Sequence, residues 1–204
     1  MATGRSRSAL AAPVALGLAV AAAGCGGTHE SAATAGTARA SATGSLAPFS
    51  GLSAQTPPLD WPHARAASGA TLPYPRGWRP LGGDRGTVSA ATRDRTGGYV
   101  GYLNITPRQG EERQSNWVSF RAAHNRREGD RSVRVLAFAR GVRVRAGTGA
   151  CVEDSYTTST GTRYIELACL IDGAHPAVVL GAAPPARWAS QAPLIARAIS
   201  SATL

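Results

Sequence analysis

The sequence contains no lysine, and its 204 residues include only one methionine, three cysteines and four histidines. Without lysine there is no Walker-type phosphate loop, and the glycine-containing stretch LGGDRGT at 81–87 lacks the residue that would reach the phosphates. No histidine stands at metal-site spacing from another histidine or cysteine. No serine has the flanking glycines of a nucleophile elbow. These absences predict a protein with no metal, no cofactor and no recognisable catalytic residues.

Positive charge is abundant, because 22 arginines face only 12 acidic residues and give a formal net charge of +10. Such an excess favours anionic polymers or lipid headgroups. The alternative is a solvated basic surface without a special partner. Nucleic acid is not expected as a partner, since the basic segments are not interleaved with aromatic residues.

No apolar run is long enough to span a membrane, which takes about 20 residues. The longest run, 9–23, has 15 uncharged residues and follows two arginines. A short apolar run with a basic front is typical of a secretory signal peptide, predicted here over 1–24.

The run ends at Ala22-Ala23-Gly24-Cys25, which resembles a bacterial lipobox. The resemblance implies cleavage before Cys25 and a lipid anchor on its sulfur, with acyl chains such as palmitate holding the protein to the membrane. Cleavage by an ordinary signal peptidase is the alternative. The expected location is the extracytoplasmic face of the cell membrane.

Composition divides the rest of the chain at about residue 70. Residues 25–70 are rich in Ala, Ser, Thr, Gly and Pro, and predict a flexible tether that could dock on the domain through Trp61. Residues 71–204 show hydrophobic periods and predict one globular, monomeric α+β domain, with a central antiparallel sheet flanked by helices. Strands are expected at 87–94, 98–106, 131–147 (broken near Gly141), 150–172 (a hairpin) and 177–183, and helices at 115–128 and 186–202.

The hairpin predicts a disulfide. If Ser159-Thr160-Gly161 forms a three-residue loop, with Gly161 in the left-handed conformation, Thr158 faces Thr162. The same register places Cys151 directly opposite Cys169, within bridging distance. A loop of two or four residues would break this match, and two reduced cysteines are the alternative in an exported protein.

Several charged residues are considered as site candidates. The pairs Glu111-Glu112 and Glu153-Asp154 are expected to be solvated, since adjacent side chains point apart. His124 is expected at the surface of its helix. Because arginine suits phosphate and carboxylate groups, a candidate anion-binding set comprises Arg121, Arg126, Arg127, Arg131, Arg134, Arg140, Arg143 and Arg145.

The segment YPRGWRPL, with Tyr74, Pro75, Gly77 and Trp78, resembles the opening of PsbP-like domains, which include the LpqN-type lipoproteins of high-GC Gram-positive bacteria. The resemblance covers about 71–204 and implies an α/β/α sandwich with binding or accessory roles. The sequence lacks the acidic opening of the family and adds a cysteine pair.

The leading hypothesis is therefore a membrane-anchored envelope lipoprotein whose domain binds anionic lipid, wall polymer or an envelope protein without catalysis. The alternatives are an envelope hydrolase whose site is scattered in sequence, and a carrier of a small ligand or lipid. Convergent Ser, His and acid in a pocket would favour the hydrolase, and an apolar cavity would favour the carrier.

Overall fold

The computed structural model describes residues 47–204, so the expected signal peptide, Cys25 and the first part of the expected tether lie outside the described residues. The described part has an α+β fold, as predicted, with nine strands, two α-helices and one short 3-10 helix. In chain order the elements are η1 (Ala47–Phe49), β1 (His63–Arg65), β2 (Thr71–Pro73), β3 (Arg79–Leu81), β4 (Val88–Arg93), β5 (Tyr99–Pro107), α1 (Trp117–Arg127), β6 (Arg131–Val144), β7 (Gly147–Thr157), β8 (Arg163–Asp172), β9 (Ala177–Ala183) and α2 (Pro185–Ser201).

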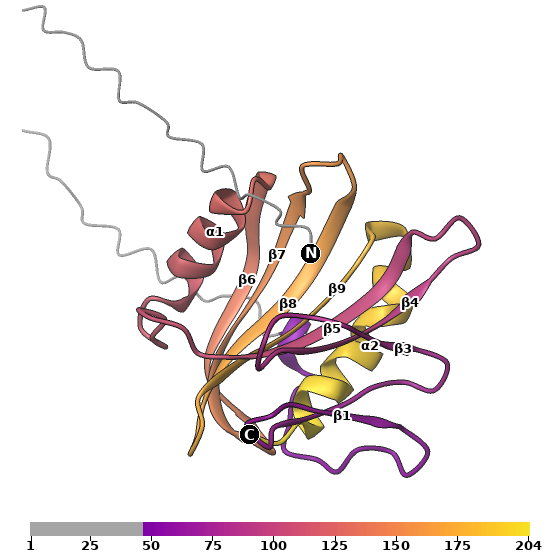
Figure 1. Ribbon diagram of the computed structural model, residues 1–204. Helices are drawn as coiled ribbons and strands as arrows, with labels where there is room; N and C mark the ends of the chain where they lie inside the picture. Colours follow the sequence, from indigo (N-terminus) through magenta and orange to yellow (C-terminus); the bar gives the residue numbers. More distant parts are fainter. Residues whose placement is uncertain (1–46) are drawn as a thin grey trace, which may run out of the picture. The chain divides into compact units, whose positions relative to one another are not determined.

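Seven strands form one antiparallel sheet in the order β3-β4-β5-β9-β8-β7-β6, and β1 pairs with β2 in a separate ribbon. The late strand β9 lies between β5 and β8, so it joins the two halves of the sheet (Figure 1). One helix packs on each face. The α2 face contains Ile195 and Ile199 with the sheet residue Val179, whereas the α1 face contains Trp117 with Val152. None of the helices within 47–204 is long and apolar enough to cross a membrane.

The α2 face depends on small residues at the helix–sheet contact. A Cβ atom on Gly181 of β9 would lie 2.6 Å from Cγ2 of Ile195 and 2.9 Å from Cδ2 of Leu103. Glycine is therefore required where α2 approaches the sheet. Pro185 is at the start of α2, where the absent N–H has no partner to lose, and Pro193 lies inside the helix.

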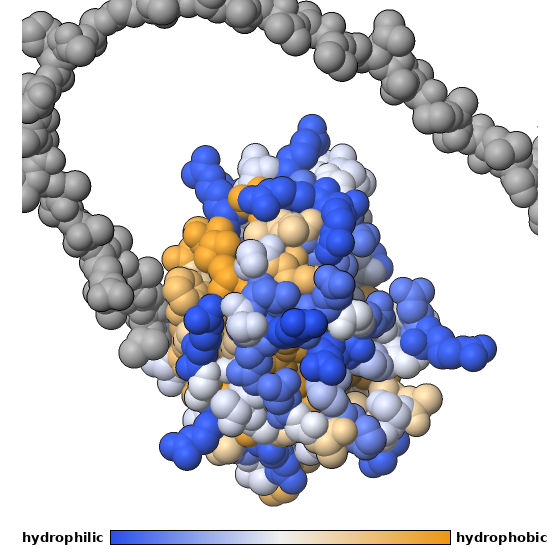
Figure 2. Space-filling view, turned by 90° about the vertical axis from the view of Figure 1, so that its left-hand side faces the viewer, coloured by the Kyte–Doolittle hydropathy of each residue, from blue (hydrophilic) through white to orange (hydrophobic). Residues whose placement is uncertain are grey.

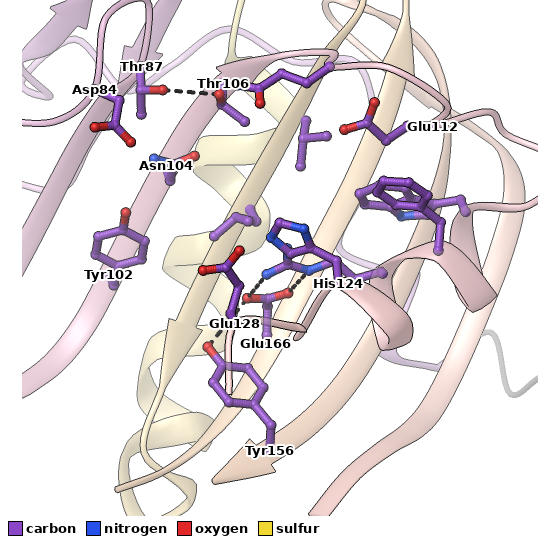
Figure 3. Close-up of a pocket in the computed structure, with 16 residues that line it drawn as sticks. Asp84, Thr87, Tyr102, Asn104, Thr106, Glu112, His124, Glu128, Tyr156 and Glu166 are labelled. Atoms are coloured by element: carbon purple, nitrogen blue, oxygen red, sulfur yellow. Dashed lines mark hydrogen bonds and ion pairs between the residues drawn. The ribbon is translucent and has the colours of Figure 1, made fainter. Parts of the chain in front are cut away.

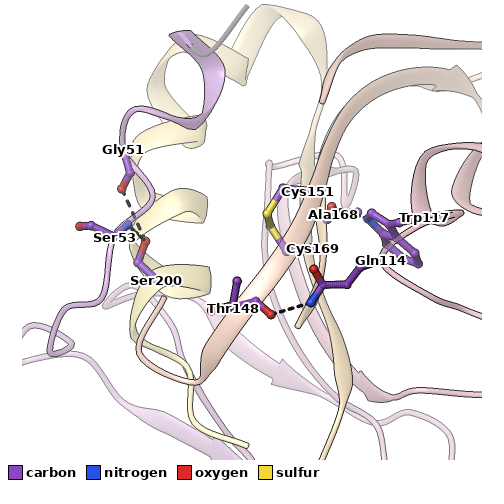
Figure 4. The surroundings of a disulfide bond; sticks show 9 residues. All are labelled: Gly51, Ser53, Gln114, Trp117, Thr148, Cys151, Ala168, Cys169 and Ser200. Carbon is purple, nitrogen blue, oxygen red and sulfur yellow. Dashed lines mark hydrogen bonds between the residues drawn. A yellow bond between two sulfur atoms is a disulfide. The ribbon is translucent and has the colours of Figure 1, made fainter. Parts of the chain in front are cut away.

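The predicted hairpin and its disulfide are confirmed. Thr158 donates its N–H to the Thr162 carbonyl at 2.9 Å, and Gly161 has a φ of 90°. This register pairs Cys151 with Cys169, whose Cα atoms are 4.1 Å apart and whose sulfurs are bonded (Figure 4). The bridge joins β7 to β8 on the α2 face of the sheet.

The YPRGW segment forms a turn that anchors the first edge of the sheet. Trp78 donates its N–H to the Pro75 carbonyl at 3.1 Å, and Gly77 has a φ of 88°. The buried Trp78 ring lies against Gly101 of β5, where a Cβ atom would be 2.6 Å from the ring. The motif is therefore a packing device in this chain.

The second half of the expected tether, 47–70, is packed on the domain instead. Phe49 and Leu52 are buried in the core of the α2 face, and Trp61 packs against it. The Ser200 hydroxyl of α2 accepts the N–H of Ser53 at 3.2 Å (Figure 4). A few buried apolar residues and backbone pairing order this segment, although its composition is typical of a flexible linker.

Two predicted elements differ in detail. Strand β6 continues through Gly141, because a bulge with a φ of 69° at this glycine replaces the expected break. A second register shift between Val135 and Ala137 ends the expected alternation, so Val135 is 41% exposed. The helix begins at Trp117, two residues later than predicted, with Asn116 at its N-cap position.

Candidate functional site

A cavity of about 510 Å³ lies on the α1 face of the sheet, beside α1 (Figure 3). The sheet has seven strands, which at about 4.8 Å spacing span close to 30 Å. Helix α1 has 11 residues and, like any helix, a diameter of about 10 Å, so it covers only part of this face. The part over β5 and β9 is left uncovered by α1, and the cavity forms there.

The floor of the cavity carries a hydrogen-bonded polar network. On β5, Tyr102 and Asn104 both bond the hydroxyl of the buried Ser89, at 3.1 and 2.9 Å. Thr106 pairs with Thr87 at 3.0 Å. These bonds hold the side chains of neighbouring strands in fixed positions, which is the preorganisation that a polar binding site requires.

The wall is formed by α1. Trp117 donates its indole N–H to the carbonyl of Ala168 at 3.0 Å, and its ring stacks on Phe120 with ring centroids 6.2 Å apart. His124 lies one helical turn after Phe120. Its side chain is half-buried and lines the cavity. Burial, and then the charge of Arg121, lower the pKa of His124, so its imidazole is neutral at pH 7.

One ion pair connects wall and floor. Arg121 of α1 donates from Nε and Nη2 to the two carboxylate oxygens of Glu166 at 2.6 and 2.7 Å. Tyr156 donates its hydroxyl to the same carboxylate at 3.5 Å. Burial disfavours the charge on Arg121, but the Glu166 carboxylate outweighs it and raises the pKa of the guanidinium. The bidentate geometry fixes the position of both side chains.

Asp154 lies directly across from Glu166 in the β7–β8 ladder and is fully buried. Burial, and then the charge of Glu166, raise the pKa of Asp154 to about 8. Asp154 is therefore protonated at neutral pH, and the guanidinium of Arg121 pairs with Glu166 rather than with Asp154. Asn125 donates to Oδ2 of Asp154 at 3.3 Å, and Oδ1 has no hydrogen-bond partner.

The expectation that the adjacent acids are solvated is wrong for one member of each pair. Glu112 is only 8% exposed, and its Oε2 atom is buried without a hydrogen-bond partner at the edge of the cavity. Asp154 is fully buried, whereas Glu111 is exposed and Glu153 half-buried. The two acids of each pair differ in burial. Glu112 is buried within the loop before α1, and Asp154 is buried under α1, where it accepts a hydrogen bond from Asn125.

The eight arginines of the candidate anion-binding set do not form one site. Arg121 is largely buried, with its side chain 12% exposed, and is committed to Glu166. The other seven are exposed and follow the C-terminal turn of α1 and the edge strand β6, on the side of the molecule shown in Figure 2. They are Arg126, Arg127, Arg131, Arg134, Arg140, Arg143 and Arg145.

The lining of the cavity combines carboxylate, amide, hydroxyl and aromatic side chains. Its lining residues, all within the described part of the chain, include no serine or cysteine that could act as a nucleophile beside His124. Among residues 47–204, no group of three His, Cys, Asp or Glu side chains could hold a metal ion.

Of the cavity residues, sequence reasoning singled out only Arg121, His124 and Glu112, and for other roles. Glu166 could have been noticed, because it is the one charged residue in the middle of the apolar stretch 164–171. The residues of the polar floor could not be recognised in the sequence, because hydroxyl and amide side chains also occur on strands that face solvent.

No protein-family model and no curated protein matches this chain. Among solved structures, a protein of unknown function from Pseudomonas aeruginosa is similar with a TM-score of 0.41 and 12% identity, over 64% of this chain and 87% of that one. A protein from Bacteroides thetaiotaomicron is similar with a TM-score of 0.33 and 18% identity, over 62% of this chain and 43% of that one. Similarities at this level carry no information about function.

Proposed function

We propose that the chain is a membrane-anchored lipoprotein of the bacterial envelope whose folded domain binds a small polar ligand without transforming it. The observation that carries the binding role is the cavity beside α1, about 510 Å³ in volume. This volume falls within the range of small-molecule sites. Its polar floor is fixed by hydrogen bonds before any ligand arrives, which lowers the entropy lost on binding.

The other binding role considered, transport of an apolar ligand, has less support. Charged and hydroxyl groups line much of the cavity, including Arg121, Glu166 and Tyr156. An apolar ligand would exclude water from the polar lining and would leave the Oε2 atom of Glu112 without a hydrogen bond, at a free-energy penalty. A hydrolase has less support, because the lining contributes no serine or cysteine beside His124.

We also propose a PsbP-like α/β/α architecture. The support is a helix on each face of a central antiparallel sheet, together with the turn at Tyr74–Trp78 that enters the first edge strand. The test is an experimental structure with a PsbP-like domain superposed on residues 71–204.

The envelope location is tested at Cys25. In cells, the unaltered chain is expected in the membrane fraction, with an N-terminal peptide whose mass includes a diacylglyceryl group. The Cys25→Ala variant is expected to be released or to remain unprocessed. Normal processing and normal membrane retention of this variant would contradict the lipoprotein proposal.

The binding role is tested on the chain purified from envelope. Native mass spectrometry of the protein is expected to show an additional mass of a small molecule. Substitution of the floor residues Asn104→Leu and Tyr102→Phe is expected to remove that mass, because both delete polar atoms of the cavity. Recovery of the protein free of any small molecule, before and after incubation with an envelope extract, would contradict this role.

A further inference from the structure

The charge of the cavity is opposite to that of the chain. Four carboxylates line it, from Asp84, Glu112, Glu128 and Glu166, and the only arginine in the lining is Arg121. The lining thus has four acidic side chains and one guanidinium, in a chain with a formal net charge of +10. Figure 3 shows Asp84 and Glu112 on opposite sides of the view, with Glu128 and Glu166 between them.

Three of these carboxylates are free to bind a ligand. Within residues 47–204 the only ion pair joins Arg121 to Glu166, so Asp84, Glu112 and Glu128 have no cationic partner in this part of the chain. Glu112 is the decisive one: it is 8% exposed, and its Oε2 atom is buried at the cavity without a hydrogen bond. A buried carboxylate oxygen without a donor is destabilising unless something completes it.

No side chain or backbone group within residues 47–204 donates to Oε2 of Glu112, so a ligand with a donor group would satisfy this atom. A ligand that carries N–H groups and a positive charge would supply both the hydrogen bond and the charge. The aromatic rings of Tyr102, Phe120 and Tyr156 also line the cavity, and ring faces attract organic cations. Phe120 already has the guanidinium of Arg127 5.5 Å from its ring centroid.

The position of the acids defines the shape of the ligand. Asp84 lies in the loop between β3 and β4, Glu112 in the loop before α1, and Glu128 at the end of α1. Their carboxylates therefore approach the cavity from different elements, and no single small ion would contact all of them. An elongated molecule with a positive group at each end would match this distribution.

We infer that the cavity binds an extended organic cation of the diamine or polyamine class, held by Glu112 and by the carboxylates of Asp84 and Glu128. This inference rests on the proposed binding function and names the ligand class of the same site. Selectivity follows from the contrast in charge: a basic chain repels free cations from most of its surface, so a diamine gains attraction only at this cavity.

The test uses three probes of equal length and different charge: 1,5-diaminopentane, 1,5-pentanediol and glutarate. Binding to the purified full chain is measured by isothermal titration calorimetry at low salt. The signal of the Trp117 indole N–H in tryptophan-labelled protein reports binding in the cavity, because Trp117 is the tryptophan of its lining. The diamine is expected to bind and to shift this signal, and the diol and glutarate are expected to bind at least tenfold more weakly.

Matched variants separate the site from general electrostatics. Glu112→Gln is expected to weaken diamine binding about tenfold or more, since it removes one charged hydrogen bond. Glu111→Gln makes the same change in net charge at an exposed neighbour outside the cavity and is expected to leave binding unchanged. Glu128→Gln, at an exposed position of the lining, is a second variant that should fold normally if Glu112→Gln does not.

Three results would overturn the inference. They are equal or tighter binding of glutarate or the diol, equal effects of Glu112→Gln and Glu111→Gln, and no binding of the diamine at millimolar concentration. None of these contradicts the proposed binding function, which fails separately if protein from envelope carries no small molecule.

Discussion

Asp154 on β7 and Glu166 on β8 are direct partners in the antiparallel ladder, so two carboxyl groups occupy neighbouring positions on the buried α1 face. Two like charges in such a position destabilise a sheet. The structure accommodates them in two ways: Arg121 neutralises Glu166 through a bidentate ion pair, and Asp154 holds a proton. The ion pair compensates the charge of Glu166, whereas the protonation of Asp154 depends on pH.

The proton on Asp154 makes stability depend on pH. Its pKa is raised from 3.8 to about 8, so between these values the folded chain holds a proton that the unfolded chain releases. The contribution of this site to the free energy of unfolding therefore falls as pH rises through this window, and the loss is complete above about pH 8. Asp154→Asn keeps the shape of the side chain and cannot ionise.

We expect Asp154→Asn to be more stable than the unaltered chain at about pH 8–9, with the difference shrinking toward about pH 5. The measurement is the thermal midpoint of both proteins across that range. Comparing the two isolates this site from the other titrating groups, among them His124, whose lowered pKa acts in the opposite sense. Two parallel curves would show that Asp154 is ionised in the folded state.

Removing the Arg121–Glu166 ion pair should lower stability more than any change at Asp154. Arg121→Met leaves the Glu166 carboxylate, whose side chain is 2% exposed, buried without a counter-charge. We expect a loss of about 3–5 kcal/mol in the free energy of unfolding, measured by urea titration. Adding Glu166→Gln to Arg121→Met should restore part of the loss. Arg126→Met, at an exposed position of the same helix, is the control and should change stability by less than about 0.5 kcal/mol.

The hairpin could be predicted from sequence because its determinants are local. Gly161 defines the turn, and the turn defines the register that brings Cys151 and Cys169 together. The α+β class followed from the same kind of periodicity. Strand β9 was predicted with its observed bounds, since the run 177–183 is uniformly apolar or small and is buried along its whole length.

The site could not be predicted in this way because its contacts are distant in sequence. Arg121 and Glu166 are 45 residues apart and meet only when α1 lies on the finished sheet. In the sequence, Arg121 resembles the seven exposed arginines that follow it. Glu112 is likewise indistinguishable from Glu111 until the loop before α1 is placed, since only the fold decides which of two adjacent acids points inward.

The exposed arginines along β6 and the end of α1 form a basic edge of the molecule. Charged residues on an edge strand prevent pairing with other sheets, which accounts for part of this pattern without any ligand. If this edge also contacts anionic headgroups, binding to phosphatidylglycerol vesicles should weaken with salt.

The vesicle measurement uses the full chain with Cys25→Ala, so that no acyl anchor contributes. Combined replacement of Arg134, Arg140 and Arg143 by Gln is expected to weaken binding tenfold or more, at about 1 kcal/mol for each charge near the surface. Arg187→Gln on α2, at an exposed position away from β6, is the control. If binding does not respond to salt, the role left for these arginines is to prevent the edge strand β6 from pairing with other sheets.

The disulfide between Cys151 and Cys169 should contribute substantially to stability. Both residues are buried, at 1% and 0% exposure, and they are 18 positions apart in the chain. Closing a loop of this length in the unfolded chain corresponds to about 3 kcal/mol, which lowers the thermal midpoint by roughly 6–12 °C when the bond is absent. We expect this decrease on reduction of the purified protein.

The double variant Cys151→Ala, Cys169→Ala should melt lower as well, and a reductant should not lower its midpoint further. Peptide mass spectrometry without reduction should recover the two cysteines as one linked species. Free thiols at these positions in protein purified from envelope, or a midpoint that reduction leaves unchanged, would contradict the prediction.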